Sequence, residues 1–225
     1  MSVLRLENVS KKYQANNESI LALDNISVEV SEGEFVALVG RSGCGKTTLL
    51  NLAGAMDFPS SGRVFLDNTE TSTLDDTGLT KIRRTKVGFI FQFFNLLPTL
   101  SAIENVELPL MLAGETSRRH DALESLRWVE MGAYAQRLPH QLSGGEMQRV
   151  AIARALVHSP KVLLADEPIG NLDTASAGIV MQLLRRTAGE RKTTILMATH
   201  SSEAAAVADT VIHLRDGRIE EIHRN

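Results

Sequence analysis

The chain has 225 residues, of which 43% are hydrophobic and 23% charged, and this composition excludes a disordered or low-complexity protein. With 24 Lys and Arg against 27 Asp and Glu, the net charge of -3 gives no global electrostatic reason to bind nucleic acid, so we expect no nucleic-acid partner. The single cysteine excludes an internal disulfide, and no apolar run approaches the roughly 20 residues that a membrane-spanning helix needs. We therefore expect a cytoplasmic protein.

The first predicted elements are two β-rich stretches, residues 2–10 and 20–30, which a polar turn at residues 14–18 separates. We expect them to pair as an antiparallel edge. Four later segments are continuous apolar runs, which are typical of strands buried on both faces of a parallel sheet. These runs are residues 35–39, 87–91, 162–165 and 194–198.

Helical patterns fall between these runs, and a hairpin turn is predicted at Asp216-Gly217. The predicted helices cover residues 46–55, about 118–130, 146–157 and 174–187. This alternation predicts an α/β fold with a parallel core sheet, an antiparallel β part and a helical insertion. We expect one domain, residues 1–225, with its core at about 1–91 and 159–225 and a helical subdomain at about 92–158. Ligand chemistry should lie at the carboxyl ends of the core strands.

A phosphate-binding loop follows the first buried strand directly, in the sequence Gly40-Arg41-Ser42-Gly43-Cys44-Gly45-Lys46-Thr47. The glycines let backbone N–H groups surround a polyphosphate, and the start of the next helix favours the anion. Lys46 adds a positive charge at the β and γ phosphates, and the Thr47 hydroxyl can bind Mg²⁺. The alternative is a glycine-rich turn between strand and helix that binds no ligand.

Two adjacent carboxylates, Asp166 and Glu167, end the third buried run. Asp166 can hold Mg²⁺ through water, and Glu167 can polarise the water that attacks the γ phosphate. An acidic pair at this place could also cap a helix or lie in a solvated turn. The phosphate-binding loop upstream favours the catalytic interpretation.

A second surface suited to phosphate precedes the helix near residue 146, in the sequence Leu142-Ser143-Gly144-Gly145-Glu146. Ser143 and Glu146 form the S-x-x-E pattern of a capping box, which by itself is a complete structural explanation. The two glycines also leave the helix N-terminus open to close approach by an anion.

In this order, these motifs and a downstream histidine resemble the ATP-binding-cassette ATPases, and the resemblance extends over essentially the whole chain. It implies a P-loop NTPase core that binds ATP and Mg²⁺ and hydrolyses ATP in a dimer with a second copy of itself. Catalysis is then assigned to Glu167, His200 and Lys46, and Mg²⁺ to Thr47, Gln92 and Asp166. Nucleotide binding is assigned to Tyr13, Gly40, Arg41, Ser42, Gly43, Cys44, Gly45, Lys46, Thr47, Thr48, Gln92, Ser143, Gly144, Gly145 and Asp173.

The resemblance also implies a role for each residue that lies outside the phosphate-binding loop and the acidic pair. Tyr13 would stack on adenine, Gln92 would sense Mg²⁺ and the transporter, and His200 would respond to the γ phosphate. Asp173 belongs to the inter-subunit loop, while Ser143, Gly144 and Gly145 act on the nucleotide of the other subunit. Simpler roles remain open: Tyr13 could end a strand, Gln92 could be a polar loop residue, Asp173 could cap a helix and His200 could be structural.

Cys44 lies within the phosphate-binding loop, near Lys46 and a helix N-terminus, which both favour a thiolate. On this basis we expect its alkylation to block nucleotide binding. The alternative is a small side chain that fills a gap.

Within the family, residues 91–100 and 103–110 with Gly170-Asn171-Leu172-Asp173 are similar to the lipoprotein-release and macrolide-export group, LolD and MacB, with the FtsE type close by. Ile169 departs from the threonine that this group often has. The resemblance implies an ATPase on the inner face of the membrane, held there by a permease subunit that contacts about Gln92 to Leu110. The alternatives are an FtsE-like ATPase that regulates cell-wall enzymes without moving solute, and a soluble cassette ATPase without a membrane subunit.

Overall fold

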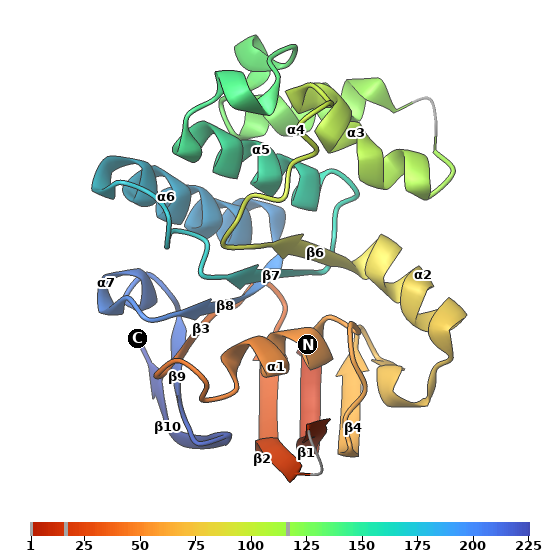
Figure 1. Cartoon of the computed structure of the whole chain (residues 1–225), viewed down its shortest axis with the longest axis vertical. Coiled ribbons are helices and arrows are strands. Elements are labelled where there is room, and N and C mark those ends of the chain that lie inside the picture. Colours follow the sequence, from red (N-terminus) through yellow and green to blue (C-terminus); the bar gives the residue numbers. More distant parts are fainter. Residues whose placement is uncertain (1, 16–17, 116–117) are drawn as a thin grey trace.

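The computed structural model describes residues 2–15, 18–115 and 118–225 (Figure 1). It confirms the predicted fold class, because a parallel core sheet, an antiparallel sheet and a group of helices are all present. The predicted polar turn between the first two strands is centred on residues 16 and 17, which lie outside the described residues.

The six-stranded core sheet has the order β10-β9-β3-β8-β7-β6, with β10 antiparallel to β9 and every other neighbouring pair parallel. The sequence does not predict β9, although it does predict the turn to β10. In that turn Asp216 and Gly217 have φ values of 48° and 75°, as a two-residue hairpin loop requires. The strands are β3 (Phe35–Val39), β6 (Val87–Ile90), β7 (Val162–Asp166), β8 (Thr194–Thr199), β9 (Thr210–Arg215) and β10 (Arg218–Arg224).

Each face of the core sheet packs into its own apolar cluster. Along β3, Phe35 and Ala37 enter one cluster, whereas Val36 and Leu38 enter the other. Successive side chains of a strand point to opposite faces, so a strand covered on both sides needs apolar residues at every position. This explains the continuous apolar runs of the sequence.

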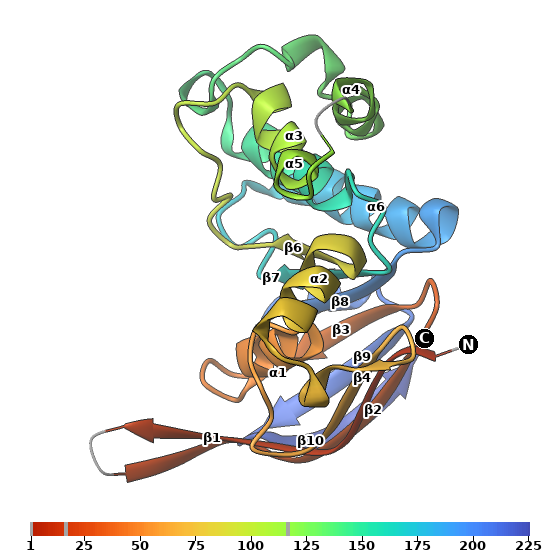
Figure 2. The same cartoon turned by 90° about the vertical axis from the view of Figure 1, so that its right-hand side faces the viewer.

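The second sheet is antiparallel, in the order β2-β1-β4-β5. Its strands are β1 (Ser2–Ala15), β2 (Glu18–Ser31), β4 (Ser61–Leu66) and β5 (Thr69–Glu70). The β1–β2 hairpin is longer than the sequence predicts and extends beyond the rest of the molecule (Figure 2). The sequence also misses β4 and β5, whose turn places Asp67 and Asn68 at φ values of 47° and 62°.

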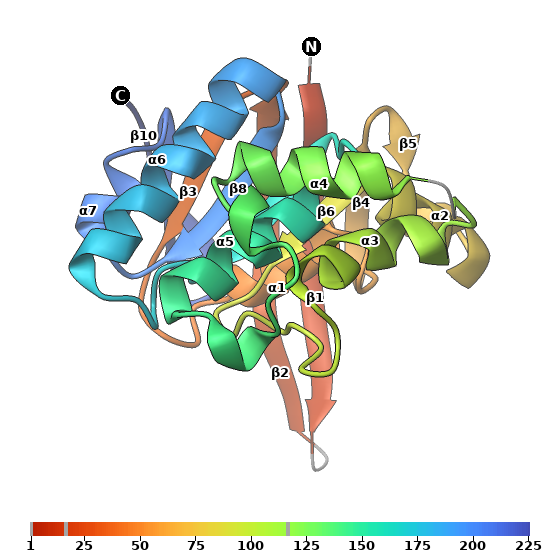
Figure 3. The ribbon, with the colours of Figure 1, turned by 90° about the horizontal axis from the view of Figure 1, so that it is seen from above.

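The helices are distributed over the two faces of the core sheet. Helix α1 lies between the two sheets, α5 and α6 lie on the opposite face of the core sheet, and α3 and α4 pack on the far side of α5 (Figures 1 and 3). Only Leu79 and Ile82 are buried in α2, which explains why its sequence shows no apolar stripe. The helices are α1 (Lys46–Ala53), α2 (Asp76–Lys86), α3 (Ala102–Leu112), α4 (Arg119–Trp128), α5 (Gly144–Leu156), α6 (Thr174–Arg191) and α7 (Ser202–Ala205).

Helix α5 approaches the core sheet closely. A Cβ atom at Gly88 of β6 would overlap the carbonyl oxygen of Ala155, so only glycine permits this contact. Short 3-10 turns at Gly132–Tyr134 and Pro139–Gln141 lie between α4 and α5. Within the described ranges, no helix is both long enough and apolar enough to cross a bilayer.

Candidate functional site

The loop between β3 and α1 has the backbone of an anion-binding cradle. Gly43 and Gly45 have φ values of 79° and 106°, and a Cβ atom at Gly45 would lie 2.6 Å from the Ala22 carbonyl oxygen. Nothing lies within 4 Å of a Cβ atom built on Gly43, so this side of the loop is open. Among the residues that the structure describes, no side chain caps the N-terminus of α1, which leaves its first N–H groups available to an anion.

Lys46 lies across this loop. Its Nζ atom donates hydrogen bonds to the carbonyl oxygens of Gly40 and Arg41, at 2.7 and 3.2 Å, and the residue is 8% exposed. Arg41 and Ser42 are exposed on the loop, and Thr48 lies half-buried on α1. A positive charge therefore lies beside the open backbone cradle, as binding of a polyphosphate requires.

Cys44 lies on the buried side of the phosphate-binding loop. Its side chain is 6% exposed and packs in the apolar cluster beneath the loop, with Leu49 and Leu50 of α1. This burial favours the gap-filling alternative, because a side chain packed among apolar groups is poorly accessible to an alkylating reagent. Only the Cys44 backbone can contribute to the cradle, and its N–H donates to the Arg41 carbonyl at 3.2 Å.

The first predicted magnesium ligands meet at the end of β7. The Thr47 hydroxyl donates to Asp166 Oδ2 at 2.9 Å, so α1 and β7 bring two oxygen donors to one point. Burial raises the pKa of Asp166, the Thr47 hydrogen bond opposes this, and the neighbouring Glu167 carboxylate raises it further. Across the ranges that the structure describes, no three His, Cys, Asp or Glu side chains form a metal cluster. A hard cation here would take its other oxygens from phosphates and water.

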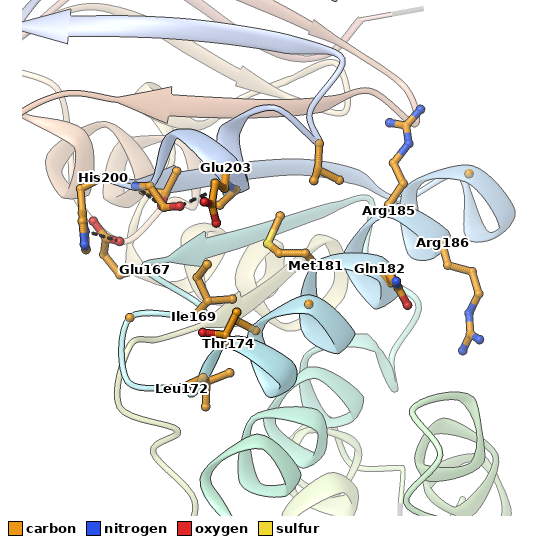
Figure 4. Close-up of a pocket in the computed structure, with 18 of the residues that line it drawn as sticks. Glu167, Ile169, Leu172, Thr174, Met181, Gln182, Arg185, Arg186, His200 and Glu203 are labelled. Atoms are coloured by element: carbon orange, nitrogen blue, oxygen red, sulfur yellow. Dashed lines mark hydrogen bonds and ion pairs between the residues drawn. The ribbon is translucent and has the colours of Figure 1, made fainter.

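Glu167 faces His200 at the mouth of a groove (Figure 4). Glu167 has the left-handed φ value of 49°, which is uncommon for a residue other than glycine. His200 Nδ1 lies 2.9 Å from Glu167 Oε2, but the two are not aligned as a hydrogen bond, and this buried oxygen has no hydrogen-bond partner among the described residues. A buried, unpaired carboxylate oxygen is costly unless a water or ligand satisfies it. The groove has a volume of about 920 Å³ and continues between α6 and α7.

Gln92 and Asp173 lie on two loops that contact one another. The Asn171 side-chain amide donates to the Gln92 carbonyl at 3.0 Å. Asp173 caps α6, accepting from the Ser176 N–H at 3.0 Å and the Ser176 hydroxyl at 2.7 Å. The hydrogen bond from the Ser176 N–H, followed by that from its hydroxyl, lowers the pKa of Asp173. The predicted helix cap is therefore present.

The Ser143-Gly144-Gly145 segment begins α5. Ser143 Oγ accepts from the Glu146 N–H at 3.3 Å, and Glu146 Oε2 accepts from the Ser143 N–H at 2.7 Å, which forms the predicted capping box. A Cβ atom at Gly145 would lie 2.6 Å from Ser176 Oγ, so this segment packs beside the start of α6. Helices α5 and α1 lie on opposite sides of the core sheet (Figures 1 and 2). The segment is thus not brought to the phosphate-binding loop of its own chain.

Tyr13 lies within β1 rather than at its end. Its ring is 37% exposed, and its hydroxyl donates to Asp57 Oδ2 at 2.9 Å. Burial raises the pKa of Tyr13, as do the hydrogen bond to Asp57 and its charge, whereas a hydrogen bond with Thr48 lowers it. Tyr13 is therefore next to α1, the helix that begins at the phosphate-binding loop.

Two polar residues of α5 that the sequence analysis misses hold the loops of the site. Arg154 donates to the carbonyl oxygens of Asn95 and Phe94, at 2.6 and 3.0 Å. The buried Gln148 side chain donates to the Pro168 carbonyl at 2.6 Å, just after Glu167. In the sequence, these residues could have been noticed as polar positions on the apolar face of a helix. That pattern does not reveal which distant loop each side chain contacts.

Comparison with known proteins agrees with this geometry. Residues 23–170, more than half of the chain, match the family described as ABC transporter. The chain is 47% identical over 225 residues to the ABC transporter ATP-binding protein MJ0796 of Methanocaldococcus jannaschii, covering 97% of this chain and 95% of that one. The lipoprotein-releasing system ATP-binding protein LolD of Granulibacter bethesdensis is 44% identical over 218 residues, with 96% and 95% covered.

A longer relative and a solved structure extend the comparison. The macrolide export ATP-binding/permease protein MacB of Syntrophobacter fumaroxidans is 42% identical over 224 residues, which are 98% of this chain but 31% of that protein. A dimeric structure of MJ0796 in a post-hydrolysis state, bound to ADP and Pi, superposes with a TM-score of 0.89 at 44% identity, covering 98% of each chain. With its phosphate-binding loop, paired carboxylates and fold, the chain belongs to the ABC transporter family and is an ATP-binding cassette ATPase.

Proposed function

We propose that this ATPase powers a membrane partner of the lipoprotein-release or macrolide-export type through ATP-driven closure of a dimer. The buried Glu167 oxygen beside His200 is the observation that carries the catalytic assignment. Glu167 follows Asp166 at the end of a core strand, and its oxygen without a hydrogen bond suits a general base that accepts from an attacking water. His200 would respond to the γ phosphate from the facing side.

The residues of one chain suit a triphosphate and a metal ion. The uncapped N-terminus of α1, the loop at residues 40–48 and the Lys46 ammonium would hold the phosphates, and Tyr13 would stack on adenine. Thr47, Asp166 and Gln92 would hold Mg²⁺, which would neutralise phosphate charge during transfer to water. The contact between Thr47 and Asp166 supports this set.

A second copy would complete each site. Ser143, Gly144 and Gly145 lie at the N-terminus of α5, which packs beside α6 and not beside the phosphate-binding loop of the same chain. In a head-to-tail dimer this surface would cover the nucleotide of the partner, and Asp173 would lie between the subunits. The solved relatives with TM-scores of 0.89 are named as dimeric, which supports this assembly.

The permease would contact residues Gln92 to Leu110 and so hold the ATPase at the inner face of the membrane. Phe93 is 69% exposed in this segment, and Leu97 is also exposed. Arg154 binds the two carbonyl groups that follow Phe93, so a force on this loop would reach α5 and its N-terminus. We infer that residues 92–158 act as a helical subdomain that moves with the permease.

The substitution Glu167→Gln tests the catalytic assignment. Loss of the base should lower turnover by about 100-fold or more, while MgATP binding persists and the ATP-bound dimer accumulates. Steady-state hydrolysis, equilibrium binding and size-exclusion chromatography measure these properties. Glu203→Gln is a matched control, because Glu203 lines the same groove but has no proposed catalytic role. Turnover at the wild-type rate in Glu167→Gln would contradict the assignment.

The partner class needs a separate experiment. Tagged Glu167→Gln protein with ATP can be purified from detergent-solubilised membranes of the source cell, and the bound proteins identified by mass spectrometry. A membrane subunit with few helices and a large external domain would support the proposal. A permease with many helices, or no membrane protein at all, would contradict the proposed partner.

A further inference from the structure

The Tyr13 ring is held by residues that no nucleotide-binding motif includes. Its hydroxyl donates to one carboxylate oxygen of Asp57, and Lys11 Nζ lies 2.6 Å from the other. Asp57 follows α1 and is separated from Tyr13 by 44 positions along the chain. A side chain far away in sequence therefore fixes the end of the tyrosine ring.

Lys11 also contacts the ring itself. Lys11 and Tyr13 are two positions apart on β1 and so share one face of the strand. The Lys11 ammonium lies 4.9 Å from the ring centroid, within the range of a cation–π contact, and only 11% of its side chain is exposed. One face of the ring is thus occupied, while Tyr13 as a whole remains 37% exposed.

The loop that carries Asp57 is fastened to β1 by further hydrogen bonds. Lys11 Nζ donates to the Phe58 carbonyl at 2.7 Å, the Lys12 N–H donates to Ser60 Oγ at 2.9 Å, and the Ser60 N–H donates to the Ser10 carbonyl at 2.8 Å. Asp57 Oδ1 also accepts from the Phe58 N–H at 2.7 Å. Burial raises the pKa of Asp57, but the hydrogen bonds from Lys11 and Tyr13 lower it overall, so the carboxylate stays ionised.

This loop begins where α1 ends, and α1 begins at the phosphate-binding loop. The same helix therefore connects the Lys46 end, where the phosphates would lie, to the Asp57 end, which fixes Tyr13. The tyrosine ring is thus tied by a hydrogen bond to the segment that follows α1, at the end away from the phosphate cradle.

We propose that Lys11 and Asp57 are positioning residues that hold the Tyr13 ring as the stacking platform for the nucleotide base. They contact the tyrosine and not the phosphate cradle, so they should control the part of the affinity that depends on the base. This inference rests on the proposed role of Tyr13 in ATP binding.

MgADP contains the base, whereas magnesium pyrophosphate contains only the phosphates. Comparing the binding of the two ligands therefore separates the affinity that depends on the base from the affinity that depends on the phosphates, and it requires no ATP hydrolysis. Asp57→Ala and Lys11→Met should each weaken MgADP binding by about tenfold, the scale of one base–aromatic stacking contact, and leave pyrophosphate binding unchanged. Isothermal titration calorimetry measures both dissociation constants. Lys86→Met is the matched control, because Lys86 also pairs with an aspartate, Asp67, and should retain wild-type affinity for both ligands.

Tyr13→Phe provides a second route, because it keeps the ring and removes only the hydroxyl that Asp57 holds. Combined with Asp57→Ala, it should weaken MgADP binding by less than the product of the two separate factors. Unchanged MgADP binding in Asp57→Ala and Lys11→Met, or an equal loss for pyrophosphate, would overturn the positioning role. A wild-type protein that binds MgADP no more tightly than pyrophosphate would instead show that Tyr13 is not a base platform, and the inference would fall with it.

Discussion

The Asp166 carboxylate suits the binding of Mg²⁺, but its ionisation lowers the stability of the folded protein. Its carboxylate is half-buried at the end of β7 beside Glu167, and burial raises its pKa despite the hydrogen bond from Thr47. For a carboxyl group with a raised pKa, the stabilising contribution is fully present below the ordinary pKa and is lost as the pH rises through the folded-state value. At neutral pH the ionised group therefore destabilises the fold, and a bound cation would be needed to compensate.

Asp166→Asn tests this balance. Without nucleotide, the variant should melt at a higher temperature than the wild type at pH 7. This difference should shrink as the pH falls through the raised pKa of Asp166 and be smallest at the ordinary aspartate pKa of about 4, since the wild-type carboxyl is then protonated. The stabilisation by MgATP and the turnover should both be lost. Thermal unfolding at the two pH values measures the effect, and equal melting temperatures at pH 7 would disprove the destabilising role of the carboxylate.

At the scale of the element, the helix N-termini show how one feature can serve two purposes. Asp173 caps α6 and Asp75 caps α2, each accepting from an N–H three residues later. Only Asp173 lies on the loop that contacts Gln92 through Asn171. Both aspartates are therefore N-caps, but Asp173 lies in the candidate site and Asp75 lies outside it.

The two caps form a matched pair of substitutions. Asp173→Ala and Asp75→Ala should each cost about 1 kcal/mol of unfolding free energy, the usual loss for an N-cap. Only Asp173→Ala should also reduce turnover. Urea denaturation and steady-state hydrolysis separate the two effects, and equal turnover in both variants would assign Asp173 a purely structural role.

The elements that can be predicted from the sequence are those whose residue pattern lies within one short segment of the chain. Strands β3, β6, β7 and β8 are recognised because burial on both faces demands apolar runs. The phosphate-binding loop is recognised because its glycines and Lys46 lie at a characteristic spacing in one short segment. Strand β4 is missed because its first three residues are exposed and only Val64 and Leu66 are buried, so it has no continuous apolar run. Asp57 and Arg154 are missed because their partners are distant in the chain, and only the fold brings them together.

At the scale of the whole molecule, a single chain does not bring its two phosphate-binding surfaces together. The phosphate-binding loop lies on the α1 side of the core sheet, and the Gly144 end of α5 lies beside α6 on the other side. A head-to-tail pair would therefore contain two composite sites, each built from both chains.

Mixing two inactive variants tests this arrangement. Lys46→Ala damages the phosphate-binding loop, and Gly144→Glu places a negative charge where the partner's phosphates would bind, although a glutamate in the first turn of α5 suits the helix. Each variant alone should be inactive. An equal mixture should recover about a quarter of wild-type turnover, because half of the dimers then contain one intact site. No recovery after subunit exchange would contradict composite sites.

The core sheet separates the two apolar clusters, so each can change in evolution without disturbing the other. One cluster holds α1 beneath the phosphate-binding loop, and the other holds α3, α5 and the segment after β6. Substitutions that reshape the second cluster are shielded from the first by a layer of strands, since packing changes are felt mainly by direct neighbours. Descendants of one ancestral ATPase can thus acquire new docking surfaces while inheriting an unaltered nucleotide pocket.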